Sequence, residues 1–194
     1  NQVKEFKERM TKSKHDVFRK MCDDYINKLE EIDCGSNYIT DKMPHNFVML
    51  GLIKMIMPTA KIIYCKRDAM DNCFSLYSHN FTDTNHGYSY NQTKLGKYYN
   101  LHNKLMKHWI SIFKKDIFVL EHEELINNQE IISKEMLSYC GLKWEKQCLE
   151  FYENNRQVQT ASNEQVRQPI NKKSLDAWKK YEPHLEDLRK SLGI

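Results

Sequence analysis

One stretch, residues 62–77, limits the possible folds of this chain more than any other. Its first part, Ile62–Cys65, is a short apolar run rich in β-branched residues, which is typical of a buried strand in a parallel sheet. Asp68 follows as a candidate N-cap, and apolar residues then recur at helical spacing as far as Tyr77. The stretch therefore predicts a strand, a polar turn and a helix, with Arg67 at the carboxyl end of the strand.

The position of Arg67 makes it a candidate ligand-binding residue, because ligands of open α/β sheets bind at the carboxyl ends of the strands. Ser75 follows eight residues later, about two turns into the predicted helix. A guanidinium donates a fork of hydrogen bonds to oxyanions, so the pair favours a phosphate ligand. The alternative is an arginine that caps the sheet edge and a serine on a helix surface.

Two further strands and several helices complete a predicted α/β pattern. Tyr38–Thr40 is a short strand before a charged loop, and Ile117–Leu120 is another buried strand. We expect at least three parallel strands with helices on both faces. The helices are expected over residues 1–32, 47–56, 94–114 and 131–140, the last ended by Gly141 as a C-cap.

Composition excludes several classes of protein. The chain of 194 residues is long enough for one domain, and its net charge of +4 favours an anionic ligand, but its lysines are too scattered for a nucleic-acid groove. The most apolar window, residues 47–65, is broken by charges and a proline, so no membrane span is predicted, and the polar start is unlike a signal peptide. The cysteines form no Cys-x-x-Cys pair and fit a reducing cytoplasm. No metal is expected, since the adjacent Glu123 and Glu124 have no His or Asp at ligand spacing and suggest a solvated helix start.

The stretch around Arg67 resembles the 3′-phosphate-binding segment of sulfotransferases that use 3′-phosphoadenosine 5′-phosphosulfate (PAPS). In that family a strand ends in Arg-Asp-Pro, and a Ser follows the Arg by eight residues; this chain has Ala69 in place of the Pro. The resemblance implies that Arg67 and Ser75 bind the 3′-phosphate. His79 stands where relatives place a longer polar side chain of the cofactor site. His122 stands where the family has a Tyr beside the nucleotide.

The loop Asp41-Lys42-Met43-Pro44 resembles the sulfotransferase loop whose lysine reaches the transferring sulfuryl group. On that resemblance Lys42 is the candidate catalytic residue, because an ammonium offsets charge on the leaving phosphate. His45 is a candidate base, since an imidazole titrates near neutral pH. Other members place a His two residues after the lysine, whereas His45 follows Lys42 by three.

Residues 160–170, Thr-Ala-Ser-Asn-Glu-Gln-Val-Arg-Gln-Pro-Ile, resemble the carboxyl-terminal nucleotide loop of bacterial tetratricopeptide-type sulfotransferases, which are distant relatives of tyrosylprotein sulfotransferase. Without the resemblance, the stretch would be interpreted as a polar connector. The resemblance implies cofactor contacts for five residues: Ser162, Gln165, Val166, Arg167 and Asn171. It also implies helical repeats in the N-terminal part of a longer parent chain.

The resemblance covers the chain from about Val17 to Leu192, but the family's opening strand and its Pro-Arg-Ser-Gly-Thr-Thr-type phosphate loop have no counterpart. It implies that residues 1–194 form a single partial domain with a P-loop NTPase-like sulfotransferase fold, in which a parallel sheet is flanked by helices and the first strand and phosphate loop are lacking. A nucleotide kinase is disfavoured because no Gly-x-x-x-x-Gly-Lys-[Ser/Thr] loop is present.

The function implied is transfer of a sulfuryl group from PAPS, without a metal, to a hydroxyl acceptor such as a protein tyrosine, a carbohydrate or a small molecule. The alternative is a non-catalytic nucleotide-binding module or an inactive fragment of such an enzyme. The expected location is the bacterial cytoplasm, or the Golgi lumen if the protein is eukaryotic.

Overall fold

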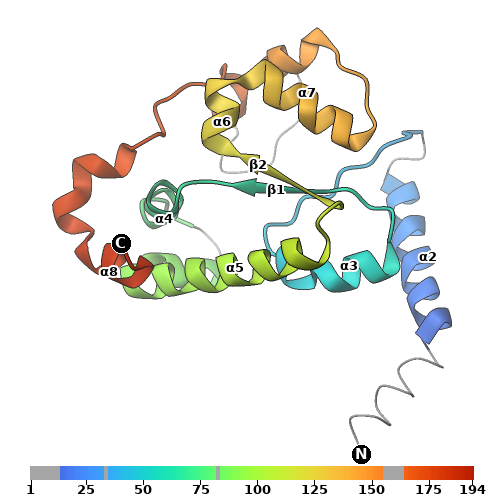
Figure 1. The fold of residues 1–194 in the computed structure, drawn as a ribbon, viewed down its shortest axis with the longest axis horizontal. Helices are drawn as coiled ribbons and strands as arrows, with labels where there is room; N and C mark the ends of the chain where they lie inside the picture. The colour runs from blue at the N-terminus through green and yellow to red at the C-terminus, as the bar shows by residue number, and fades with distance from the viewer. Residues whose placement is uncertain (1–13, 33–34, 82–83, 155–163) are drawn as a thin grey trace, which may run out of the picture. The chain divides into compact units, whose positions relative to one another are not determined.

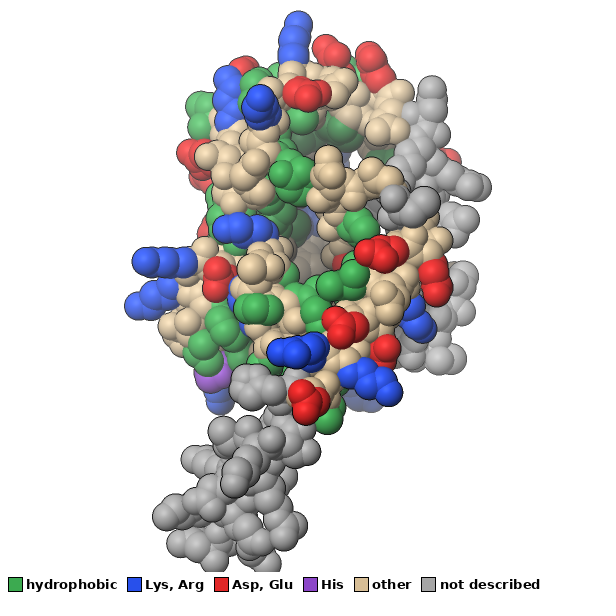
Figure 2. Space-filling model, turned by 90° about the vertical axis from the view of Figure 1, so that its right-hand side faces the viewer, with side chains coloured by type: hydrophobic (Ala, Val, Ile, Leu, Met, Phe, Trp, Pro, Cys, Tyr) green, Lys and Arg blue, Asp and Glu red, His purple; other side chains and the backbone are tan. Residues whose placement is uncertain are grey.

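The computed structural model describes residues 14–32, 35–81, 84–154 and 164–194. The chain divides into two compact units, Asn1–Ala60 and Lys61–Ile194. Figure 1 draws the elements from blue at the N-terminus to red at the C-terminus. On the face drawn in Figure 2, hydrophobic side chains reach the surface among charged side chains of both signs.

The described part of the first unit is built from two α-helices and a short 3₁₀ helix. The helix α2 (Lys14–Ile32) contacts α3 (Leu50–Ile56), which follows the 3₁₀ helix η1 (Asn46–Met49). Tyr25 of α2 donates a hydrogen bond of 2.6 Å to Oδ2 of Asp41, and this bond, with burial, raises the pKa of Tyr25 to about 12. The helix expected over residues 1–32 is confirmed for residues 14–32, and residues 1–13 lie outside the described residues. The helix expected over residues 47–56 is confirmed, with its first turn in the 3₁₀ form.

The expected strand at Tyr38–Thr40 is wrong: these residues have no regular secondary structure. The Tyr38 side chain is 63% exposed and Ile39 is 43% exposed, so the apolar residues that suggested a strand are not buried in a sheet. A run of three residues makes few ladder hydrogen bonds and is stable as a strand only when it is paired and covered. Hydrophobic character alone was therefore too weak a signal here.

The second unit contains a parallel sheet of two strands among its described residues. The strands β1 (Ile62–Lys66) and β2 (Ile117–Glu121) pair from Ile62 opposite Ile117 to Lys66 opposite Glu121. Both predicted strands and their parallel direction are confirmed. The expected count of three is not, because the segment expected as the other strand is irregular. β1 is also less buried than predicted, with Ile63 39% exposed.

Helices pack on both faces of this sheet, as expected for an α/β fold. The Tyr64 ring of β1 lies 5.7 Å from the His102 ring of α5 (Gln92–Ile112). The Phe118 ring, one register position away, lies 5.5 Å from the Tyr139 ring of α7 (Gln129–Cys140). Successive strand residues point to opposite faces, and Figure 1 accordingly shows α5 and α7 on opposite sides of the strands.

The core of the second unit lies between α4 (Ala69–Tyr77), α5 and α8 (Glu186–Leu192). Its buried members are Met70, Cys73, Leu95, Leu185 and Leu188. Burying each large aliphatic side chain contributes about 1.5–3 kcal/mol. The remaining elements are α6 (His122–Asn127) and the 3₁₀ helices η2 (Thr84–Tyr90), η3 (Lys146–Glu153), η4 (Gln165–Arg167) and η5 (Ala177–His184).

The C-terminal helix α8 is fastened to α5 by side-chain hydrogen bonds. Gln92 donates to the carbonyl of His184 at 2.8 Å and accepts from the amide of Leu188 at 3.1 Å. About two turns further along α5, Asn100 donates to the carbonyl of Ser191 at 2.9 Å. The last residues of the chain are therefore anchored to the helix that covers one face of the sheet.

Candidate functional site

The carboxyl ends of β1 and β2 lie side by side because the strands are parallel and in register. The last paired residues, Lys66 and Glu121, form an ion pair of 2.8 Å between Nζ and Oε1. Both side chains are nearly half exposed, so this pair adds little stability. Because the two strands end side by side, Arg67, which follows β1, lies next to His122, which follows β2.

Arg67 is held at both its backbone and its side chain. Its carbonyl accepts a hydrogen bond of 3.3 Å from the Tyr99 hydroxyl of α5. Its guanidinium donates through Nη2 to the carbonyl of Ser174, at 2.8 Å. The Nε atom is buried and has no hydrogen-bond partner within the described residues. The guanidinium thus has more donors than this part of the protein satisfies, which is the condition for accepting an anion.

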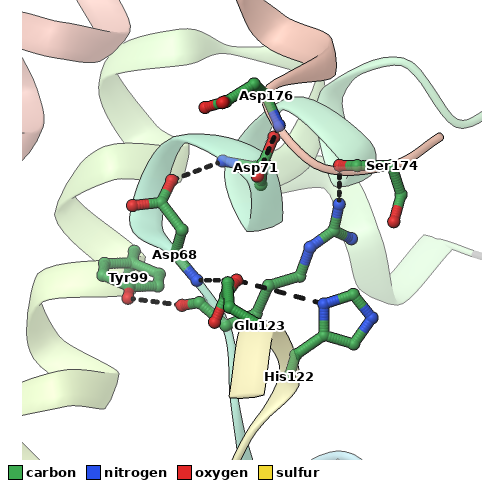
Figure 3. Close-up of polar contacts among 8 residues, drawn as sticks. Asp68, Asp71, Tyr99, His122, Glu123, Ser174 and Asp176 are labelled. Carbon is green, nitrogen blue, oxygen red and sulfur yellow. Dashed lines mark hydrogen bonds and ion pairs between the residues drawn. The ribbon is translucent and has the colours of Figure 1, made fainter. Parts of the chain in front are cut away.

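The turn after Arg67 is fixed by three carboxylates, labelled in Figure 3. Asp68 caps α4 as predicted: its Oδ1 accepts from the Asp71 amide at 3.0 Å. The Asp68 amide donates to Oε1 of Glu123, at 2.9 Å, which ties the turn to the end of β2. Oδ2 of Asp71 accepts from the amide of Asp176, at 3.0 Å. The first turn of α4 is therefore joined both to the neighbouring strand and to the C-terminal segment.

His122 lies partly buried beside this turn. Its Nδ1 is buried, and Oε1 of Glu123 lies 3.9 Å away, beyond hydrogen-bond distance. Burial lowers the pKa of His122, and the positive charge of Arg67 lowers it further, against smaller opposite effects of Glu123 and Asp71. The imidazole is therefore neutral at pH 7 and able to donate one hydrogen bond and accept another.

The turn after β1 does not carry a net positive charge that would attract anions in general. Lys66 is paired with Glu121, and the turn after β1 carries the carboxylates of Asp68, Asp71 and Glu123, which accept from backbone amides. An anionic ligand would be attracted through directed hydrogen bonds from Arg67 and not through a broad positive potential.

Two other expected nucleotide contacts lie on or just after α4. The Ser75 side chain is exposed on α4, and the guanidinium of Arg67 bonds to Ser174 and not to Ser75. His79 packs against the Phe81 ring in an edge-on contact of 4.6 Å between ring centroids.

The contacts given for the expected nucleotide residues of the carboxyl-terminal loop are to other parts of the chain than Arg67. Ser162 lies outside the described residues. Gln165, Val166 and Arg167 form the 3₁₀ helix η4, which contacts η3. Asn171 folds back on its own loop, with Oδ1 accepting from the Lys173 amide at 3.1 Å. The residues that reach the turn after β1 follow this loop, at positions 174–176.

The two expected catalytic residues belong to the first unit. Lys42 is exposed in the irregular loop that precedes η1. His45 is partly buried immediately before η1, and its ring centroid lies 6.4 Å from that of Phe47. Neither residue takes part in the contacts of the second unit described above.

The described residues contain no group of three or more His, Cys, Asp or Glu side chains that could hold a metal ion. Within the same residues, no helix has both the length and the apolar character needed to cross a membrane.

The structure thus has a strand that ends just before Arg67 and a capped helix that carries Ser75 eight residues after it. The model of the family described as "Sulfotransferase family" matches residues 3–146. The chain belongs to the sulfotransferase family. The matched residues include Lys42, Arg67 and His122, and end before the loop of residues 160–170.

A relative of this sulfotransferase chain occurs in Aquifex aeolicus (strain VF5), where it is described as an uncharacterized protein. The two are 35% identical over 185 residues, which make up 94% of this chain and 23% of the relative. The chain thus spans less than a quarter of the length of the relative it matches. The description of this relative names neither a family nor an activity.

Sequence reasoning missed three residues that hold Arg67 and its turn in place. Tyr99 lies in the helix expected over residues 94–114 and was given no role there, yet its hydroxyl donates to the Arg67 carbonyl; burial raises its pKa to about 12. Glu123 was expected to be solvated, but it is partly buried and accepts from the Asp68 amide. Ser174 acts through its backbone carbonyl, so its side-chain type gave no signal.

Proposed function

We propose that the protein to which this chain belongs transfers a sulfuryl group from PAPS to a hydroxyl acceptor. The observation that carries this proposal is the arginine at the carboxyl end of β1, with a buried Nε that has no partner within the described residues. Sulfotransferase family membership supports the reaction class, and a nucleotide co-substrate and an acceptor follow from it.

Arg67 and Ser75 would bind the 3′-phosphate of the nucleotide. Fixing the Arg67 backbone through Tyr99, and its guanidinium through Ser174, supports this role because a ligand-binding arginine is most effective when its direction is set before binding. The neutral imidazole of His122 would lie beside the nucleotide, where it offers a hydrogen bond without competing for negative charge.

The remaining nucleotide contacts rest on the resemblance to tetratricopeptide-type bacterial sulfotransferases. They are His79, Ser162, Gln165, Val166, Arg167 and Asn171. These contacts are supported by residues 174–176, here called the strap, which follow the nucleotide loop. The strap is hydrogen-bonded to the turn after β1. On the same resemblance we propose helical repeats in the longer protein.

Lys42 would act on the reacting atoms. In sulfuryl transfer the bond between sulfur and the bridging phosphate oxygen breaks, a bond between sulfur and the acceptor oxygen forms, and the acceptor proton passes to a base. An ammonium at Lys42 would stabilise the negative charge that develops on the bridging oxygen. His45 is the candidate base.

The second candidate function is a nucleotide-binding module without transfer activity. The observation that favours it is the sequence itself, since residues 1–194 contain no glycine-rich loop to cradle the 5′-phosphosulfate. An assay of the full-length protein with radiolabelled PAPS and a panel of phenolic, carbohydrate and peptide acceptors separates the two functions. Labelled acceptor supports transfer; tight nucleotide binding with no labelled acceptor supports the module.

The test of the site is nucleotide affinity. Arg67→Ala should weaken binding of adenosine 3′,5′-bisphosphate about ten- to hundredfold in calorimetry, because a hydrogen bond to a charged group is worth about 1.5–3 kcal/mol. Ser75→Ala should cost less, and Lys190→Ala, which removes an exposed lysine paired only with Glu186, should have no effect. Unchanged affinity in both Arg67→Ala and Ser75→Ala would contradict the proposed site.

A further inference from the structure

We propose that Asp71 is a positioning residue for Arg67: its buried carboxylate holds the turn at Asp176, and that turn sets the carbonyl of Ser174 against the Arg67 guanidinium. The inference rests on the proposed function, because it takes Arg67 to be a nucleotide ligand. On this proposal, Asp71 affects nucleotide affinity although it contacts neither the nucleotide nor the Arg67 guanidinium.

The burial of Asp71 calls for an explanation. The side chain is 3% exposed, and a buried carboxylate is costly unless it is fully hydrogen-bonded. Oδ2 accepts from the Asp176 amide at 3.0 Å, while Oδ1 is buried with no partner among the described residues. Its place in the first turn of α4 recovers only part of this cost, through the helix dipole. The hydrogen bond to the Asp176 amide is what offsets the remaining cost of this burial.

The residue that Asp71 binds has an unusual backbone. Asp176 has φ 57° and ψ 17°, and within the described residues it is the only non-glycine with a positive φ. Such a left-handed conformation costs of the order of 1–2 kcal/mol for an ordinary L-residue, less for Asp, and persists where its surroundings impose it. Asp176 also makes two local contacts with Lys179: its carbonyl accepts from the Lys179 amide at 3.0 Å, and its side chain forms an exposed ion pair with the Lys179 ammonium, which is worth little. The Asp71 bond is the contact that joins this turn to α4.

The turn has a direct geometric consequence at Arg67. Two residues before Asp176, the carbonyl of Ser174 accepts from Nη2 of Arg67 at 2.8 Å. Two bonds therefore join the segment after β1 to the strap of residues 174–176, one from Arg67 and one from Asp71, as Figure 3 shows for the labelled partners. If the second bond is lost, the turn at Asp176 relaxes and the carbonyl leaves the guanidinium.

Without the bond to Ser174, the Arg67 guanidinium would no longer be held in one direction before the nucleotide binds. The Ser174 carbonyl is the hydrogen-bond partner that the described residues give this guanidinium, so its loss leaves the side chain without a fixed direction. A freed arginine side chain also regains rotamer entropy that must be lost again on binding. Both effects lower nucleotide affinity.

The test is a double-mutant cycle in the full-length protein, read by calorimetry with adenosine 3′,5′-bisphosphate. Asp71→Ala should weaken binding about tenfold. Asp71→Asn, which keeps an oxygen acceptor of the same size, should bind within about threefold of the unmodified protein. Arg67→Ala with Asp71→Ala should bind no more weakly than Arg67→Ala alone, since the second residue acts through the first. If Asp71→Ala does not fold, the same cycle is run with Asp71→Ser.

A matched control distinguishes the proposed positioning role of Asp71 from a purely structural role. Gln92→Ala breaks two hydrogen bonds to the same C-terminal segment, at His184 and Leu188, without touching Arg67 or the strap. It should lower the melting temperature and leave nucleotide affinity within about twofold. Hydrogen exchange at the Asp176 amide should be fast in Asp71→Ala and slow in Asp71→Asn and Gln92→Ala.

Three outcomes overturn the inference. One is an additive cycle, and another is an equal loss of affinity in Gln92→Ala at an equal loss of melting temperature. In both, Arg67→Ala still weakens binding, so the proposed function stands without this inference. The third is nucleotide affinity that is insensitive to Arg67→Ala, which removes the assignment of Arg67 and the inference together.

Discussion

Gly96 of α5 lies directly against Ser191 of α8. A Cβ placed at Gly96 would come within 2.8 Å of the Ser191 Cβ and 3.2 Å of its carbonyl carbon. The serine cannot easily move away, because its hydroxyl donates to the Leu188 carbonyl at 2.8 Å and contacts the Gln92 carbonyl at 3.3 Å. The absence of a side chain at position 96 therefore allows α8 to dock on α5.

Replacing this glycine tests the contact. Gly96→Ala should destabilise the second unit by up to about 2 kcal/mol, since overpacking costs about 1–3 kcal/mol and the gain in helix propensity offsets about 1 kcal/mol of it. Urea unfolding followed by tryptophan fluorescence reports this unit alone, because Trp109, Trp144 and Trp178 all lie in it.

Gly87 provides the matched control. It has a negative φ and nothing within 4 Å of an added Cβ, so Gly87→Ala should change the free energy of unfolding by less than about 0.5 kcal/mol. Equal effects of the two substitutions would show that the approach of α8 to α5 is not what requires Gly96.

The core beneath α8 gives a second stability prediction. Leu188 is 0% exposed and packs in the cluster with Met70 and Leu95. Leu188→Ala should lower the free energy of unfolding by about 2–5 kcal/mol, the sum of lost burial and the cavity left behind. Leu101, which is 66% exposed on α5, is the control, and Leu101→Ala should cost less than about 0.5 kcal/mol. A small effect at Leu188 would mean that α8 does not close this core.

The local parts of the fold were predictable from the sequence, since they depend on neighbours in the chain. β1, the Asp68 cap and α4 were all expected from apolar spacing and one carboxylate, and the structure confirms them. Gly141 ends α7 with φ 74°, as its glycine predicted. In each case the signal and the structure it specifies lie within a few residues of each other.

The contacts that shape the candidate site were not predictable, because they join distant parts of the chain. Ser174 is 107 positions from Arg67, and Asp176 is 105 positions from Asp71. Both partners contribute backbone atoms, which every residue has, so side-chain patterns carry no trace of them. The sequence could propose Arg67 as a ligand but not the strap that directs it.

Thiol labelling tests the burial of Cys73. The side chain is 0% exposed, and burial, with a smaller effect of Asp68, raises the pKa of its thiol to about 12. Because the thiolate is the reactive form, Cys73 should resist iodoacetamide in the folded protein. Cys73→Ser should therefore bind as many labels as the unmodified protein when folded and one fewer in denaturant. A label lost from the folded variant would show that this thiol is accessible.

Acid should destabilise the second unit through two histidines. Burial lowers the pKa of His102, and burial together with the charge of Arg67 lowers that of His122, below the ordinary value of 6.5. Between the lowered values and 6.5, the unfolded chain binds more protons than the folded chain, so the free energy of unfolding rises with pH there. The contribution is fully present above 6.5 and is lost as the pH falls.

His102→Gln isolates one of these contributions. Its unfolding free energy should fall less than that of the unmodified protein between about pH 7.5 and pH 5.5, because one proton uptake on unfolding is removed. If His102→Gln and the unmodified protein show parallel curves, His102 does not carry a lowered pKa.

Lys42 is the last and most consequential test, since it asks whether the first unit supplies chemistry. The Lys42 side chain is exposed in its loop, and the structure describes no ion pair for it. Its ammonium is therefore available to a ligand. In the full-length protein Lys42→Ala should lower kcat by a factor of the order of 10²–10³, the cost of removing one preorganised donor from a transition state, while nucleotide affinity changes little. Lys28→Ala, at an exposed position of α2, should leave both unchanged. A raised KM with intact kcat would instead make Lys42 a binding residue, because an interaction made equally in the ground state and the transition state lowers KM without raising kcat.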